Sequence, residues 1–208
     1  MRNLKSILVI VFVSVIMVSC DKDNEVVLEP VVAQKVENLP APAVTDRTVN
    51  PPVESGEFVK FSFKTGTIVT SDDWDIAFRA TKILVNGGGS IGLTDEPTRT
   101  GNASLALVSS TFSDVKEAPA ESNFGQDSNG TYALPWGSGN GWYTYNGQTN
   151  IISTIAGKII VVKTLDGNYA KMEIISYYKD LDASNPANGR YYTFNYVYNP
   201  NVGEKSFE

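Results

Sequence analysis

The stretch GKIIVVKTLDGNYAKMEIISYY, residues 157–178, is typical of an antiparallel β-hairpin. Two runs rich in β-branched and aromatic residues flank an Asp-Gly dipeptide at 166–167, and this dipeptide between such runs is a strong signal for a tight hairpin turn. In the second run Met172 shares its face with Ala170 and Ile174, because side chains of a strand alternate with a period of two. We expect that face to be buried, with Met172 in the core.

The same alternation recurs on both sides of this hairpin. It is found in EFVKFSFKT (57–65), WDIAFR (74–79) and RYYTFNYVY (190–198), and SLALVSSTF (104–112) is a further candidate strand. The stretch 190–198 places Tyr192, Phe194, Tyr196 and Tyr198 on one face. In residues 74–79 the alternation sets Trp74, Ile76 and Phe78 opposite Asp75, Ala77 and Arg79. Since no stretch has the periodicity of a long amphipathic helix, we predict an all-β fold with a single antiparallel domain.

The N-terminus has the pattern of a bacterial lipoprotein signal. Arg2 and Lys5 precede an apolar run, residues 7–18, that is shorter than the roughly 20 residues needed to span a bilayer as a helix. Cys20 follows Val-Ser, as in a lipobox, which predicts a signal peptide over residues 1–19 and a lipidated (palmitate-bearing) Cys20. The alternative is a plain signal peptide with an accidental cysteine. Lipid on Cys20 would anchor the protein to a membrane without spanning it.

The segment between this cysteine and the first predicted strand is rich in proline. Residues 20–56 hold five of the ten prolines, and proline fixes φ and lacks a backbone donor, so we predict an extended tether. The predicted domain then covers residues 57–208. The acidic DKDNE at 21–25 resembles surface-export signals of Bacteroidetes-type lipoproteins; a solvated tether is the alternative. We therefore expect an outer-membrane lipoprotein, exposed at the cell surface if DKDNE is an export signal.

Composition excludes several classes of function. Loss of residues 1–19 would leave 15 basic against 23 acidic residues, a net charge of −8, which argues against nucleic acid as a partner. The chain has no histidine, and Cys20 is its one cysteine, so neither a histidine-based catalytic triad nor a zinc site is expected. Asp72, Asp73 and Asp75 leave a carboxylate-based enzyme as an outside alternative, but such clusters are usually a solvated edge. We expect no enzymatic activity.

Two motifs imitate ligand-binding loops. Gly87, Gly89 and Gly92 match G-x-G-x-x-G, but the dinucleotide fingerprint requires a helix next, and LTDEPTRTG follows instead. The stretch DLDASNPANGRY, residues 180–191, begins like a calcium loop but has Pro186 where the turn glycine belongs. We predict loops between strands at both places, without a nucleotide.

Residues 114–156 form a long irregular segment that combines Gly, Asn, Ser and Pro with aromatic side chains. Long irregular segments are often functional, and aromatic rings among polar residues suit a planar ligand. The ligand-binding candidates are therefore Trp136, Trp142, Tyr143 and Tyr145. The alternative is that these rings only close the open end of the sheet.

Several of these features together resemble the HmuY-like haem-binding lipoproteins of Bacteroidetes. They are the lipobox, the Pro-rich segment, DDWDIAFRATKILVNGGG (72–89), VKEAPA (115–120), WYTYN (142–146), VVKTLDGNYAKMEIISYYKD (161–180) and RYYTFNYVY (190–198). The resemblance implies an all-β protein for iron acquisition that binds haem or a related tetrapyrrole and passes it to a TonB-dependent outer-membrane receptor. It also places one axial iron ligand shortly after WYTYN, where this chain has Asn150.

The chain departs from that family in its iron ligands. Such proteins hold haem iron with two His or two Met, whereas this sequence has no His, and Met172 is expected in the core. Tyrosinate ligates haem in some proteins, which makes Tyr143 or Tyr145 the substitute ligand. Stacking of a metal-free porphyrin, or of haem without strong axial ligands, is the other reading. A second hypothesis is that the fold has diverged to bind a glycan or a protein partner.

Overall fold

The structure, a computed structural model, describes residues 27–208. The predicted signal peptide and the predicted lipidation at Cys20 lie outside the described residues. Within 27–208 no helix is long and apolar enough to cross a membrane.

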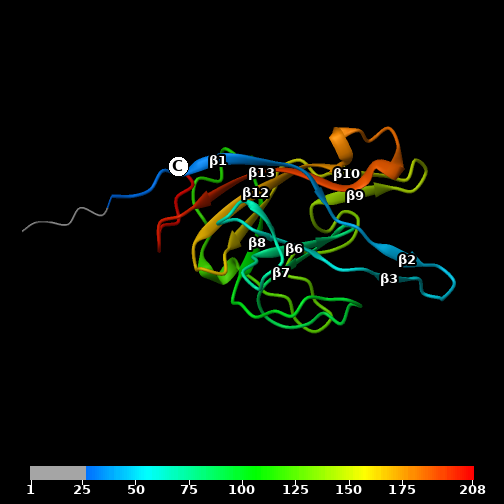
Figure 1. The fold of residues 1–208 in the computed structure, drawn as a ribbon. Coiled ribbons are helices and arrows are strands. Elements are labelled where there is room, and N and C mark those ends of the chain that lie inside the picture. The colour runs from blue at the N-terminus through cyan, green and yellow to red at the C-terminus, as the bar shows by residue number, and fades with distance from the viewer. Residues whose placement is uncertain (1–26) are drawn as a thin grey trace, which may run out of the picture.

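The fold consists of two antiparallel sheets and two separate hairpins, and every strand pair among residues 27–208 is antiparallel (Figure 1). The larger sheet has the order β1-β13-β12-β11-β8, with β1 Val32–Pro40, β8 Ser104–Ser109, β11 Lys158–Lys163, β12 Tyr169–Tyr178 and β13 Gly189–Asn199. The smaller sheet has the order β5-β4-β6-β7, with β4 Val59–Ser62, β5 Thr67–Val69, β6 Ile76–Arg79 and β7 Lys82–Val85. The hairpins are β2 Val44–Asp46 with β3 Val53–Ser55, and β9 Tyr143–Asn146 with β10 Ile151–Thr154. The remaining elements are the short 3-10 helices η1 Glu121–Asn123, η2 Lys179–Leu181 and η3 Pro186–Asn188. The all-β prediction is confirmed.

The main core lies between the two sheets and is largely aromatic. Phe61 of β4 meets Phe194 of β13 edge to face, with ring centroids 5.4 Å apart, and Phe78 of β6 lies 4.8 Å from Tyr192. Met172 is fully buried in the same cluster. The predicted shared face of Tyr192, Phe194, Tyr196 and Tyr198 and the core position of Met172 are both confirmed.

The prediction for Trp74 was wrong. Trp74 packs in a separate cluster with Ala77 and Leu84, on the opposite side of the smaller sheet from Ile76 and Phe78. The alternation fails because Trp74 precedes the strand, which begins at Ile76, and because β6 is buried on both faces.

The prediction of a tether over residues 20–56 was wrong for residues 32–40, which form β1. This strand pairs with β13 along the edge of the larger sheet, and Leu39 is buried there. Pro40 is tolerated because it is the last residue of an edge strand, where its missing donor interrupts no ladder. The following segment also has structure, since residues 44–55 form the β2–β3 hairpin.

The three glycines after β7 begin a loop in which backbones approach closely. A Cβ at Gly87 would lie 1.9 Å from the Ala103 carbonyl oxygen, and one at Gly88 would lie 2.0 Å from that of Asp127. No helix follows within the described residues 88–120, which agrees with the prediction of a loop.

Candidate functional site

A pocket of about 460 Å³ lies where the β2–β3 hairpin, the β9–β10 hairpin and the β12–β13 connection meet. Figure 1 shows these hairpins at the end of the molecule opposite to the start of β1 and the C-terminus. The lining residues are Arg47, Tyr145, Asn150, Ile152, Tyr177, Tyr178, Pro186, Ala187, Gly189 and Arg190. We call this cavity the hairpin pocket.

The β9–β10 hairpin supplies an exposed phenol to the pocket. The Tyr145 hydroxyl donates to Asn150 Oδ1 at 2.6 Å, and its backbone N–H donates to Ser138 Oγ at 2.8 Å. Asn150 has a φ of +57°, the left-handed conformation that Asn tolerates better than most residues, and it turns the chain into β10. Tyr145 is 47% exposed and is therefore available to a ligand.

The β12–β13 connection is irregular where it lines the pocket. The pairing of β12 with β13 shifts register twice, between Ile174 and Ser176 and between Ser176 and Tyr178. Arg190 has a φ of +73°, strained for a residue with a Cβ. Such bulges and strained residues often occur beside binding sites, where they redirect side chains.

The loop of this connection is fixed from β1. Asn38 donates through its amide to Asp180 Oδ1 and accepts from the Asp180 N–H, both at 2.8 Å. Because β1 holds the loop, the strand that sequence reasoning assigned to the tether also supports the pocket.

The hairpin pocket is positively charged in an acidic chain. Its charged lining residues are Arg47 and Arg190, and none of its described lining residues is acidic. Arg190 donates through Nη1 to the Ala43 carbonyl, which leaves further N–H groups for other acceptors. Burial raises the pKa of Tyr177 well above its usual value, and nearby Arg190 partly opposes the rise. Tyr177 is therefore a neutral phenol at physiological pH.

The predicted binding residues separate into three groups. Tyr145 and Asn150 line the hairpin pocket. Trp142 and Tyr143 are only 2% and 6% exposed, and the Trp142 ring lies 5.2–5.9 Å from the rings of Tyr177 and Tyr192. They form an aromatic layer beneath the pocket. This position is the one expected if these rings only close the open end of the sheet.

Trp136 lies outside the pocket. Its ring stacks on Tyr132 at 6.0 Å, the Lys82 Nζ lies 4.7 Å from its centroid, and its Nε1 donates to Thr81 Oγ1. With 46% of its surface exposed, Trp136 forms a separate aromatic platform.

Sequence reasoning missed Arg47, Arg190, Tyr177 and Tyr178. Arg47 was assigned to the tether, and the other three were read only as parts of strands or loops. The signal that could have identified the two arginines is their positive charge, because basic residues are fewer than acidic residues in this chain.

Other polar clusters have structural partners. Asp75 is almost fully buried and accepts from the backbone N–H groups of Phe63 and Leu165, each at 2.7 Å, so it joins the smaller sheet to the β11–β12 turn. Burial raises its pKa to about 6. Within residues 27–208 no group of three or more acidic, His or Cys side chains could hold a metal ion.

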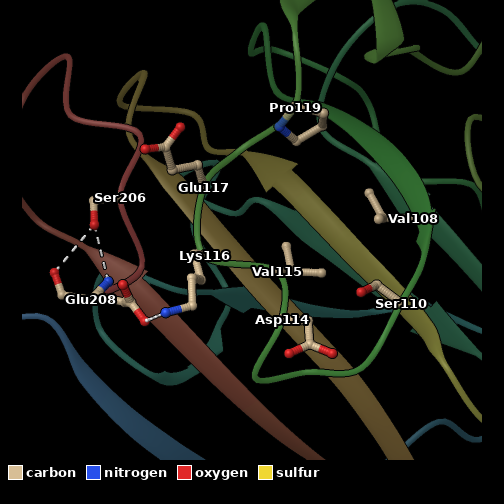
Figure 2. A pocket seen from close by; sticks show the side chains of 9 residues that line it. All are labelled: Val108, Ser110, Asp114, Val115, Lys116, Glu117, Pro119, Ser206 and Glu208. Carbon is tan, nitrogen blue, oxygen red and sulfur yellow. Dashed lines mark hydrogen bonds and ion pairs between the residues drawn. The ribbon is translucent and has the colours of Figure 1, made fainter.

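A second pocket, of about 510 Å³, lies near the C-terminus between the end of β8 and the loop 114–119 (Figure 2). Figure 2 shows Lys116 reaching the C-terminal residue Glu208, an ion pair of 2.7 Å. Asp114 and Glu117 also line this pocket, and none of its described lining residues is aromatic. It therefore lacks both features of the hairpin pocket, the aromatic wall and the excess of positive charge.

One of the comparisons with known proteins identifies a family. The model of the HmuY protein family matches residues 54–196. No curated protein matches the chain significantly.

Three solved structures are similar to this chain at low identity. An apo HmuY analogue from Tannerella forsythia is 14% identical, with 84% of this chain and 99% of that chain covered and a TM-score of 0.48. A protein from Bacteroides vulgatus described as HmuY-like and haem-binding is 14% identical, with 70% and 86% covered and a TM-score of 0.43. A protein from Bacteroides fragilis described as a lipoprotein is 15% identical, with 69% and 83% covered and a TM-score of 0.44.

Proposed function

The chain belongs to the HmuY family, and from that premise we propose that it is a non-enzymatic protein that binds haem or a related tetrapyrrole in the hairpin pocket. The observation that carries the proposal is the composition of this pocket. It combines tyrosine rings with two arginines and, among its described lining residues, no acid. A planar macrocycle with carboxylate arms is a ligand of matching chemistry.

The pocket suits a ligand that is only partly enclosed. Burial of apolar surface contributes about 25 cal/mol per Å², against which the costs of association must be set. Tyr145 and Ile152 offer such surface on one wall, and Pro186 and Ala187 offer it on the other.

The position of the pocket suits delivery to a partner. The described chain begins just before β1, at the end of the molecule opposite to the hairpin pocket (Figure 1), and a lipidated Cys20 would precede it in the sequence. The hairpin pocket is therefore remote from the point at which the chain enters the described fold. This arrangement fits transfer to a TonB-dependent outer-membrane receptor from a surface lipoprotein.

A haemin titration of residues 21–208 tests the proposal. We expect saturable one-to-one growth of a shifted Soret band, recorded in both iron oxidation states. Tyr145→Phe should change that spectrum if its phenolate ligates the iron, whereas Tyr143→Phe should not, because Tyr143 is buried beneath the pocket. A titration that shows only the spectrum of free haemin would refute haem binding.

A second candidate function is glycan binding at the Trp136 platform. Sugars stack on exposed aromatic rings. The ring of Trp136 is held in its exposed position by stacking on Tyr132 and by its hydrogen bond to Thr81. A glycan array, repeated with Trp136→Ala, tests this alternative. Binding that survives in Trp136→Ala would exclude the platform.

A further inference from the structure

The hairpin pocket offers a ligand two cations from different parts of the chain. Arg47 follows β2, and Arg190 lies at the start of β13, yet both side chains line the same cavity and both residues are exposed. Guanidinium groups pair with carboxylates through two parallel hydrogen bonds and keep their charge at all physiological pH values. The pocket therefore has the chemistry to hold two carboxylates.

Arg190 is placed for this role by the backbone. Its strained φ of +73° turns the side chain toward the β2–β3 hairpin, where Nη1 donates to the Ala43 carbonyl. That bond uses one of the five donors of the guanidinium and leaves the others for a ligand. Arg47 approaches from the loop of the same hairpin, so the hairpin joins the two cations.

The pocket is less suited to hold a metal. Its polar lining groups apart from the arginines are the phenols of Tyr145, Tyr177 and Tyr178 and the amide of Asn150. The Tyr178 oxygen accepts from the Ile152 N–H, the Tyr145 hydroxyl is bonded to Asn150, and burial keeps Tyr177 neutral. A phenol whose oxygen already has a hydrogen-bond partner, or whose ionisation is opposed by burial, is a weak iron ligand.

Building on the proposed function, we propose that this pocket recognises a tetrapyrrole by its two propionate carboxylates, through Arg47 and Arg190, so that metal-free protoporphyrin binds as tightly as haem. The iron atom of haem then forms no bond that holds the ligand in the pocket. The specificity is for the anionic edge of the macrocycle.

Calorimetric titration of residues 21–208 with three ligands tests this inference. The ligands are haemin, protoporphyrin IX and protoporphyrin IX dimethyl ester, in one mild detergent at one pH. We expect the dissociation constants of haemin and protoporphyrin IX to agree within about threefold, and the diester to bind at least about tenfold more weakly, because charge-assisted hydrogen bonds are lost. Binding of the two acids should also weaken as salt rises.

Arginine variants separate charge from packing. Arg47→Gln and Arg190→Gln should each weaken protoporphyrin IX binding about fivefold, the scale of one largely exposed ion pair. The charge-retaining variants Arg47→Lys and Arg190→Lys should recover part of the loss. Lys116→Gln is the matched control, because it removes one exposed cation from the pocket of Figure 2, at the other end of the molecule, and should leave binding unchanged.

Each outcome distinguishes the inference from the proposed function. Binding of haemin without binding of protoporphyrin IX would overturn the inference and leave haem capture standing. Equal affinity for the acid and its diester would overturn the role of the arginines, as would Gln variants that bind like the Lys116→Gln control. No binding of any of the three ligands would refute the proposed function itself.

Discussion

Asp75 should give the protein a stability that increases as the pH falls from 7 to 4.5. The carboxyl is almost fully buried between the smaller sheet and the β11–β12 turn, and burial raises its pKa from 3.8 to about 6. The folded protein therefore holds this proton more tightly than the unfolded chain does. The resulting stabilisation is fully present below pH 3.8 and is lost as the pH rises through about 6.

The size of the effect follows from the two pKa values. A shift from 3.8 to about 6 corresponds to about 3 kcal/mol between the fully protonated and fully ionised limits. Between pH 7 and pH 4.5 the folded carboxyl takes up most of its proton while the unfolded one takes up little, so the group contributes about 2 kcal/mol over this interval. Asp166 acts in the opposite direction, because hydrogen bonds from Thr164 and Tyr198 outweigh burial and lower its pKa.

Urea unfolding of the wild type and of Asp75→Asn at both pH values isolates this contribution. The amide has one acceptor oxygen for the two N–H donors, Phe63 and Leu165, so the variant should be less stable at every pH. The test is the change with pH: the stability lost by substitution should be about 2 kcal/mol larger at pH 4.5 than at pH 7. Asp73→Asn, a neighbouring exposed control, should show no such change. The reasoning is refuted if the Asp75→Asn difference is the same at both pH values.

Three further outcomes are expected. Asp127→Ala should reduce the free energy of unfolding by about 3–5 kcal/mol, since it leaves the buried guanidinium of Arg99 without one of its two carboxylates; a loss below about 1 kcal/mol in urea unfolding would contradict this. Trp142→Ala should cost about 3–5 kcal/mol and Trp136→Ala less than about 1 kcal/mol, measured by thermal unfolding, because only Trp142 is buried; similar losses would mean that the assignment of core and surface is wrong. Removal of residues 21–40 should lower the melting temperature and expose the edge of β13, because Leu39 alone buries a side chain worth about 1.5–3 kcal/mol; an unchanged melting temperature would show that β1 is a dispensable arm.

The fold could be predicted where one face of a strand meets the core. In β13 the aromatic residues Tyr192, Phe194, Tyr196 and Tyr198 recur at every second position, and this spacing gives both the strand and the face that meets the main core, while Val197 on the other face packs in a second cluster. The alternating pattern fails for β6, because both faces of this strand are buried and burial therefore does not alternate along it. It also fails for β1, whose outward residues are exposed and whose pairing with β13 depends on the rest of the sheet.

The site could be predicted only in part, because it is built from segments that are distant in the sequence. Aromatic composition directed attention to the segment that forms the β9–β10 hairpin, where Tyr145 lines the hairpin pocket, and Asn150, which the family resemblance indicated, lines it too. Composition cannot distinguish an exposed ring from a buried one, so Trp142 and Tyr143 were grouped with them. Nothing local marks Arg47 and Arg190 as neighbours, since their proximity depends on the β2–β3 hairpin folding back on the start of β13.

The lengths of the strands explain why the pocket forms at this end of the molecule. β12 and β13 have 10 and 11 residues, whereas the strands of the smaller sheet have three or four, so the longer pair extends beyond the cover that the smaller sheet provides. The β9–β10 hairpin packs on the part of β12 that is left, with Trp142, Tyr177 and Tyr192 filling the space beneath. A rigid aromatic floor under separately connected hairpins can keep its shape while the walls adjust. A site of this kind allows recognition to depend on the charge of the ligand's edge, with no need for a fixed pair of metal ligands.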